Sequence, residues 1–280
     1  MSRIYLRFPG GKPKALTFSY DDGVETDKRL IAIFQKHNMK GTFNINSLLF
    51  APEGTVYPKG TIHRRMSKSD CYETYRDSGM EVAIHGAEHL FWSEAPRDVA
   101  AYDIIKDREL LEEMFSSVIR GGAYPYGDYD DSAVEALKAA GIVYCRTVKS
   151  TGGFRLPQDW LRLPATCHHD DPRLMELADS FLALPDRKLH PYLFYVWGHS
   201  YEFDQKNNWD RIEAFTEKME NKDEIWYATN IEIYDYVDAY RRLQISLDGR
   251  HIHNPSALSV WICANGETHE IPAGKTVTLA

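Results

Sequence analysis

The sequence predicts an α/β fold in which parallel strands close into a barrel. Short apolar runs alternate with longer amphipathic stretches along most of the 280 residues, a pattern typical of repeated βα units. Eight apolar runs lie before residue 231, which is enough for a barrel. After residue 243 short alternating runs are separated by Asp-Gly and Asn-Gly, which favours antiparallel strands. We therefore predict a barrel over residues 1–243 and a small C-terminal β-strand appendage over residues 244–280.

The predicted strands and helices alternate along the chain. Strands are expected at residues 15–20, 41–46, 80–85, 118–124, 142–148, 160–165, 192–197 and 224–230. Helices are expected at residues 25–37, 67–78, 96–115, 130–140, 172–184, 208–220 and 231–243. Ser67 and Asp130 are suitable N-caps for two of these helices, and Gly79 and Gly141 follow the ends of two. Residues 51–66 show neither pattern and are expected to form a long loop that shapes a substrate cleft.

The composition narrows the class of protein. The chain is 43% hydrophobic and 26% charged, which is ordinary for a globular protein. Its formal net charge of -8 argues against partners such as nucleic acid and anionic membranes. The four cysteines form no C-x-x-C pair, so we expect free thiols. The N-terminus has no apolar run of the signal-peptide kind, and we predict a cytoplasmic protein.

Residues that can do chemistry follow several of the predicted strands. In a parallel α/β barrel such residues gather at the carboxyl ends of the strands. Asp21 and Asp22 end the first strand, and because neighbouring strand residues point to opposite faces, we expect them to have different roles. His85 ends the third strand, and a helical turn from it to His89 would point both imidazoles at one place. Together with Asp22, the two histidines would form a metal site whose remaining coordination positions are open to water and substrate. His199 follows the seventh strand.

These stretches resemble the polysaccharide deacetylases, carbohydrate esterase family 4, whose domain is also called the nodulation-protein-B-like homology domain. "TFSYDDG" resembles the first motif of that family, "HGAEH" the second, "AYPYG" the third and "VWGHS" the fifth, in the family's order. The resemblance implies an irregular (β/α) barrel of seven to eight parallel strands. It also implies one divalent metal ion as cofactor, with zinc favoured and nickel, cobalt and manganese left open.

The resemblance implies a metal-dependent hydrolase that removes N- or O-linked acetyl groups from an acetylated carbohydrate. The matching residues would be Asp21 as catalytic base, His199 as general acid, Asp22, His85 and His89 as metal ligands, and the backbone N–H of Tyr126 as an oxyanion donor. Trp197 stands where the family usually has a leucine that lines the acetyl pocket, and Tyr124 is a further candidate to contact the substrate.

One position departs from the family pattern. The third motif usually opens with an arginine that orients the catalytic aspartate, but here that position is Ala123, and Arg120 lies three residues earlier. Arg146 belongs to the next predicted strand, in an apolar run where a guanidinium needs a carboxylate partner. We hypothesise that Arg146 reaches across the barrel mouth to Asp21 and replaces the missing arginine.

Three alternatives stay open at this point. The same fold could hydrolyse a small cyclic amide or ureide instead of a carbohydrate. "HGAEH" also fits the H-x-x-E-H pattern of zinc peptidases, with Glu88 as base, although that pattern requires a helix. A non-catalytic sugar-binding module is the third alternative. His168 and His169 also attract attention as possible ligands, but consecutive side chains diverge, so at most one is expected to face the cleft.

Overall fold

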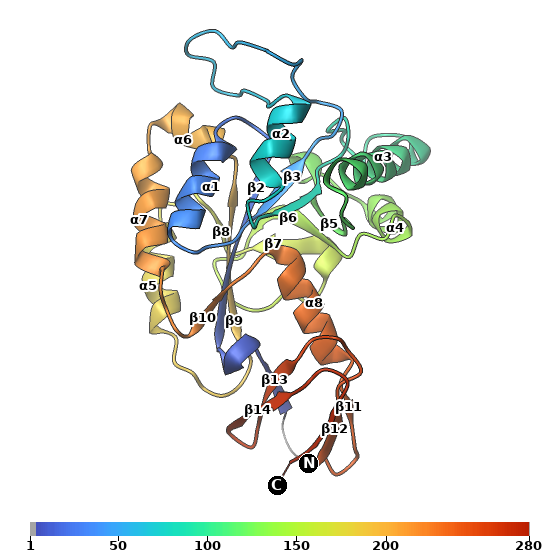
Figure 1. Ribbon diagram of the computed structural model, residues 1–280, viewed down its shortest axis with the longest axis vertical. Coiled ribbons are helices and arrows are strands. Elements are labelled where there is room, and N and C mark those ends of the chain that lie inside the picture. The colour runs from blue at the N-terminus through green and yellow to red at the C-terminus, as the bar shows by residue number, and fades with distance from the viewer. Residues whose placement is uncertain (1–3, 280) are drawn as a thin grey trace.

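The computed structural model describes residues 4–279, and its centre is a sheet of parallel strands flanked by helices (Figure 1). All the strand pairs of this sheet are parallel. The strands are β2 (Lys14–Asp21), β3 (Thr42–Ile45), β4 (Glu81–Ile84), β5 (Gly121–Ala123), β6 (Tyr144–Ser150), β7 (Leu163–Ala165), β8 (Cys167–His168), β9 (Tyr192–Gly198) and β10 (Ile225–Tyr227). The predicted α/β fold with parallel strands is confirmed.

The sheet curls so that its two ends meet. Its order is β7-β6-β5-β4-β3-β2-β9-β8, and β10 pairs with the start of β2. β7 and β8 lie at opposite ends of that order, yet only Thr166 separates them in sequence. The N–H of Thr166 donates to the carbonyl of Tyr195 on β9, 2.8 Å away. The chain itself therefore closes the sheet into an irregular barrel.

Eight α-helices lie within the described residues. They are α1 (Asp27–Lys36), α2 (Lys68–Tyr75), α3 (Arg97–Phe115), α4 (Asp131–Ala139), α5 (Leu174–Ala183), α6 (Tyr201–Lys206), α7 (Trp209–Met219) and α8 (Asn230–Arg241). Seven of them fall on the predicted ranges, and the six-residue α6 was not predicted. The side chains of Ser67 and Asp130 accept backbone N–H groups at the starts of α2 and α4, as their sequence positions predicted. Three short 3₁₀ helices lie at Pro9–Gly11, Pro125–Gly127 and Trp160–Arg162.

Strand β2 carries the first aspartate into the interior. All eight of its residues are buried, because the sheet is covered on both faces. Leu16 and Phe18 pack into the larger apolar core, whereas Ala15 packs into a second core with Tyr195 of β9. Alternation along the strand puts Asp21 on the same side as Ala15. The strand's own periodicity therefore places one carboxylate inside the barrel.

The C-terminal segment forms two small antiparallel sheets at the lower end of Figure 1, as predicted. One contains β11 (Gln244–Ile245), β12 (His251–His253) and β15 (Thr276–Thr278), and the other contains β1 (Ile4–Arg7), β13 (Val260–Ala264) and β14 (Glu267–Ile271). Asn265 and Gly266 join β13 to β14 with φ angles of 53° and 87°, which suits a two-residue hairpin turn. The pairing of β1 with β13 was not predicted, and it ties the start of the described chain to the appendage.

Two further observations concern the whole described chain. All four cysteines are free, as predicted, and all four are buried. Within residues 4–279, no helix combines the length and the apolar character that a membrane crossing requires.

Candidate active site

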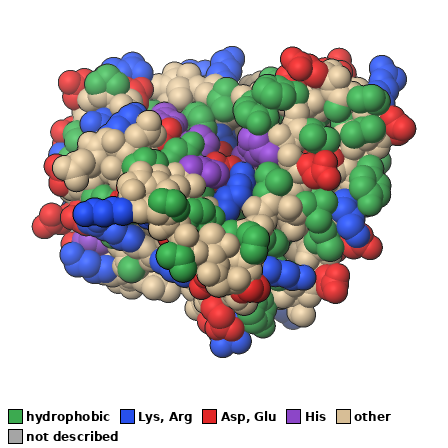
Figure 2. All heavy atoms as spheres, turned by 90° about the horizontal axis from the view of Figure 1, so that it is seen from above, with side chains coloured by type: hydrophobic (Ala, Val, Ile, Leu, Met, Phe, Trp, Pro, Cys, Tyr) green, Lys and Arg blue, Asp and Glu red, His purple; other side chains and the backbone are tan. Residues whose placement is uncertain are grey.

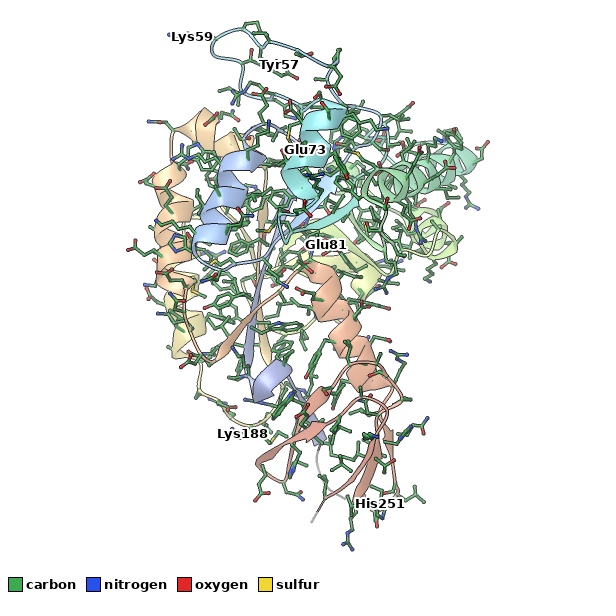
Figure 3. All side chains as sticks on the ribbon, viewed as in Figure 1. Tyr57, Lys59, Glu73, Glu81, Lys188 and His251 are labelled. Atoms are coloured by element: carbon green, nitrogen blue, oxygen red, sulfur yellow. The ribbon has the colours of Figure 1, made fainter. Side chains whose placement is uncertain are left out.

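A pocket opens at the carboxyl ends of β2, β4, β5 and β9. Its lining includes Asp21, Asp22, His63, Arg65, His85, His89, Tyr124, Tyr126, Trp197, His199 and Tyr201. Seen from above in Figure 2, histidine side chains gather around a central hollow, with acidic and basic side chains beside them. Figure 3 labels Tyr57 and Lys59 on the long loop that projects beyond α2 at this same end of the barrel. The structure thus brings the sequence-predicted residues of four strands to one place.

The two adjacent aspartates reach this pocket by different routes. Asp21 is the last residue of β2 and is 2% exposed. Asp22 adopts a left-handed conformation, with φ of 85°, and Gly23 follows with φ of 64°. This conformation is costly for a residue other than glycine, and the bond from the Asp22 N–H to the Asn44 carbonyl, 3.0 Å long, helps to hold it. The turn sends the second carboxylate into the same pocket from another side.

Asp22, His85 and His89 form a group that suits a metal ion. Oδ1 of Asp22 lies 4.0 Å from Nε2 of His85 and 3.9 Å from Nε2 of His89, and the two Nε2 atoms are 3.2 Å apart. Nδ1 of His85 is 2.9 Å from the carbonyl oxygen of Ala123, which can only accept, so we assign the ring proton to Nδ1. The lone pair on Nε2 then faces the other two ligand atoms. Two imidazoles and a carboxylate arranged in this way fit a divalent first-row ion.

Burial favours the neutral form of both imidazoles. It lowers the pKa of His85, and it lowers the pKa of His89 to about 4, with His85 as the second cause for His89. Neutral imidazoles are the form that binds metal ions.

The segment between the two histidines is not helical, so the predicted helical turn is wrong. Gly86 and His89 have φ angles of 73° and 56°, and the N–H of His89 donates to the Gly86 carbonyl at 3.3 Å. With two left-handed residues and a bond between residues three apart, the segment is a turn. Because the H-x-x-E-H peptidase pattern requires a helix, this geometry removes that alternative and the role of Glu88 as its base.

Asp21 is held by two side chains from other strands. Arg146 on β6 donates through Nη2 to Oδ2, and Asn44 on β3 donates through Nδ2 to Oδ1 at 2.7 Å. The guanidinium of Arg146 is buried and lies over the ring of Trp197, 4.3 Å from its centre. Burial alone would raise the pKa of Asp21, but Arg146 and two nearby histidines bring that pKa below its usual value. The carboxylate is therefore ionised although it is buried.

His199 follows β9 on the other side of Asp21. Its Nε2 lies 3.7 Å from Oδ2 of Asp21, and its Nδ1 lies 3.5 Å from Oε1 of Glu202 on α6. Burial lowers the pKa of His199, but Glu202 and the aspartates outweigh burial and raise that pKa above its usual value. The imidazole thus holds its proton more strongly than a free histidine does.

Three aromatic residues were predicted to contact the substrate or the reacting atoms. Trp197 lines the pocket and has its Nε1 buried without a hydrogen-bond partner. Tyr124 also lines the pocket, but its hydroxyl donates to the Leu161 carbonyl at 2.6 Å. Tyr126 is 56% exposed at the mouth, and its ring stacks on Phe91 with centroids 3.8 Å apart. Together they give the pocket apolar walls.

Three contacts of the aspartates were not predicted. Asn44 contacts Asp21, and its position in the apolar run "GTFNIN" was a usable signal, since a polar residue in a buried strand needs a partner. His63 lies 3.2 Å from Oδ2 of Asp22, and Arg65 donates to the Asp22 carbonyl at 2.7 Å. Both come from the long loop. The predicted role of that loop at the cleft did not extend to particular residues.

The comparison with protein families decides the classification. A family model described as polysaccharide deacetylase matches residues 9–145. Residues 9–145 of the chain belong to the polysaccharide deacetylase family. The stretches "TFSYDDG", "HGAEH" and "AYPYG" lie within the matched residues, and "VWGHS" lies beyond them. None of the curated proteins matches this chain.

Solved structures share its fold at low sequence identity. A Mycobacterium smegmatis protein with the provisional name polysaccharide deacetylase is 18% identical, with a TM-score of 0.60 over 84% of this chain and 94% of its own. A family 4 carbohydrate esterase from Streptomyces lividans, solved with acetate, is 10% identical, with a TM-score of 0.50 over 76% of this chain and 91% of its own.

A third structure shows that family membership does not guarantee activity. It is a mutant of a Bacillus anthracis family 4 pseudoenzyme with restored activity. That mutant is 17% identical, with a TM-score of 0.50 over 81% of this chain and 69% of its own. Activity must therefore be argued from the residues of this chain.

Proposed function

We propose that this protein is a metal-dependent hydrolase that removes N- or O-linked acetyl groups from an acetylated carbohydrate. One observation carries the proposal: an ionised, buried Asp21 lies beside a separate group of metal-ligand type, and the two share no side chain. A base and a metal site in one pocket are what metal-assisted hydrolysis needs. Family membership supplies the substrate class.

Asp22, His85 and His89 would hold the ion. A divalent cation there supplies Lewis acidity, which polarises an acyl carbonyl and lowers the pKa of a water molecule toward neutrality. Zinc is favoured for this donor set, and nickel, cobalt and manganese also suit it.

Asp21 acts as the general base. Its carboxylate is ionised and points into the pocket, where it removes a proton from the attacking water. Arg146 and Asn44 each bond one of its oxygens, so the carboxylate is held in one orientation from two strands. Such a base contributes roughly 10² to 10⁴ in rate.

His199 acts as the general acid. Its Nε2, 3.7 Å from the base, is placed to donate a proton to the leaving amine or alcohol, and the negative charge of Glu202, 3.5 Å from Nδ1, favours the protonated ring. The backbone N–H of Tyr126 at the pocket mouth stabilises the oxyanion, a donor type that is worth about 3 kcal/mol. Trp197 and Tyr124 form the apolar wall against which the acyl group and the sugar bind.

The proposal is tested by an assay of the zinc-loaded protein. The substrates are acetylated amino-sugar oligomers, acetylated xylan and small cyclic amides, with release of acetate or ring opening as the readout. We expect acetate from at least one carbohydrate, and a loss of about 10² to 10⁴ in kcat in Asp21→Asn. A zinc-saturated protein that loses zinc in His85→Ala/His89→Ala and releases no acetate from any carbohydrate would contradict the proposal. Ring opening without acetate release would indicate that the substrate is a cyclic amide and not an acetylated carbohydrate.

A further inference from the structure

A second histidine and carboxylate cluster lies behind His199. His169 and Asp170 follow the short strand β8, and Glu202 comes from α6. Nε2 of His169 is 3.2 Å from Oε2 of Glu202 and 3.4 Å from Oδ2 of Asp170. With His168 these side chains form a group whose ligand atoms all lie within 4.8 Å of one another. None of the four belongs to the group of Asp22, His85 and His89.

His169 is fully buried, yet neither ring nitrogen has a hydrogen-bond partner. Its ring stacks against Tyr20 at 5.7 Å and Phe203 at 4.2 Å, which fixes its orientation. The carboxylate oxygens approach Nε2 closely but from directions that do not line up with an N–H bond. A buried nitrogen without a partner is costly, and a cation can bind ligands that converge from several directions.

The remaining contacts support the two carboxylates. Asn208 donates through Nδ2 to Oδ1 of Asp170 at 3.2 Å. The backbone N–H of Asp170 donates to Nδ1 of His168 at 3.2 Å, so a neutral His168 carries its proton on Nε2. That Nε2 lies 3.2 Å from Oε2 of Glu202. His168 is therefore placed to hold Glu202, as residues around metal ligands commonly do, and not to bind an ion itself.

We propose that His169, Asp170 and Glu202 form a second divalent-cation site, distinct from the one beside Asp21. One imidazole and two carboxylates suit zinc or manganese, and open positions would be filled by water. At present the ammonium of Lys206, which is half exposed, contacts Asp170. The ion takes the place of that positive charge. It binds the carboxylate of Glu202, whose other oxygen faces His199, and so fixes α6 behind the general acid.

The test is a count of zinc equivalents by mass spectrometry after equilibration with a zinc buffer. The wild-type protein should hold two, and His85→Ala/His89→Ala should hold one. Adding His169→Gln or Asp170→Asn to that double variant should remove the remaining zinc ion. Adding His168→Gln, the matched control, should retain the ion with affinity about 10- to 100-fold weaker. Circular dichroism verifies that each variant folds, and Asp170→Asn serves if His169→Gln does not.

Lys206→Gln provides a change in the opposite direction. In the His85→Ala/His89→Ala protein it should tighten zinc binding by about two- to five-fold, because it removes an ion pair that competes for Asp170. Folded His85→Ala/His89→Ala protein that holds no zinc would overturn the proposal, and so would unchanged affinity in Lys206→Gln. Occupancy of the site at Asp22, His85 and His89 is measured separately, as the difference in zinc equivalents between wild type and His85→Ala/His89→Ala.

Discussion

Replacement of Arg146 should weaken both the fold and the reaction. Arg146 and Asp21 are 1% and 2% exposed, and the guanidinium donates to the carboxylate. Arg146→Met fills most of the space but leaves Asp21 buried with Asn44 as its remaining donor. Removing one partner of a buried ion pair costs about 3–5 kcal/mol of unfolding free energy. The loosened base should lower kcat by about 10², as for a reacting group displaced by about 1 Å.

The measurement is the free energy of unfolding in urea for Arg146→Met, Asp21→Asn and the double variant, each compared with that of wild type. If the loss comes from an unpaired Asp21, the double variant should be more stable than Arg146→Met alone, because no buried charge is left without a partner. Arg120→Met is the matched control. Arg120 pairs with Asp235 at 2.6 Å, but both are about a third exposed, so its loss should cost at most about 1 kcal/mol.

Two results would refute this reasoning. One is Arg146→Met protein with wild-type turnover, which would mean that Asp21 needs no orienting arginine. The other is a double variant no more stable than Arg146→Met, which would mean that the guanidinium acts through Trp197 and the surrounding packing and not through the carboxylate.

Further variants test other parts of the structure. Asp21→Asn should keep its metal and lose hydrolysis, whereas Asp22→Asn should lose metal; equal metal loss by elemental analysis would contradict the separate roles. Glu81, labelled in Figure 3, has its pKa raised by burial from 4.5 to about 7. In the unfolded chain Glu81 loses its proton at a lower pH than in the folded protein, so the free energy of unfolding should fall as the pH rises from 4.5 to about 7. Thermal unfolding of Glu81→Gln should show a weaker fall over the same pH range. Gly198→Ala would place a Cβ 2.1 Å from Nδ1 of His169 and should cost about 1–3 kcal/mol in the same assay.

Long periodic elements were predictable because each carries its own signal. The eight predicted strands and seven predicted helices have counterparts, since each strand lies within a short apolar run and each helix repeats a helical spacing. Short elements carry too few residues for a period. β8 has two residues and α6 has six, and both lie at the second cluster. The pairing of β1 with β13 joins the two ends of the described chain, so no local pattern could reveal it.

The candidate site also contains residues that the sequence could predict and residues that it could not. Asp21, Asp22, His85 and His199 follow strands, so the fold class was enough to bring them together. His63 and Arg65 reach Asp22 from a loop whose path depends on its own contacts and not on periodicity. The wrong helical turn at His85 has a similar cause, since the left-handed φ of a non-glycine residue such as His89 is set by tertiary contacts.

The register of the sheet explains how an arginine from another strand could serve Asp21. Ala123, where the family usually has its orienting arginine, is the direct neighbour of Arg146 in the pairing of β5 with β6. Both positions lie at the same height of the barrel. A side chain as long as arginine spans the distance between adjacent parallel strands, about 4.8 Å, so its charged end can reach the same point from either strand. What the proposed chemistry requires is a guanidinium at Oδ2 of Asp21, and the neighbouring strand places one there. Arginine moved back to position 123 should therefore be able to restore activity to Arg146→Ala, and failure of a folded Ala123→Arg/Arg146→Ala protein to recover turnover would contradict this equivalence.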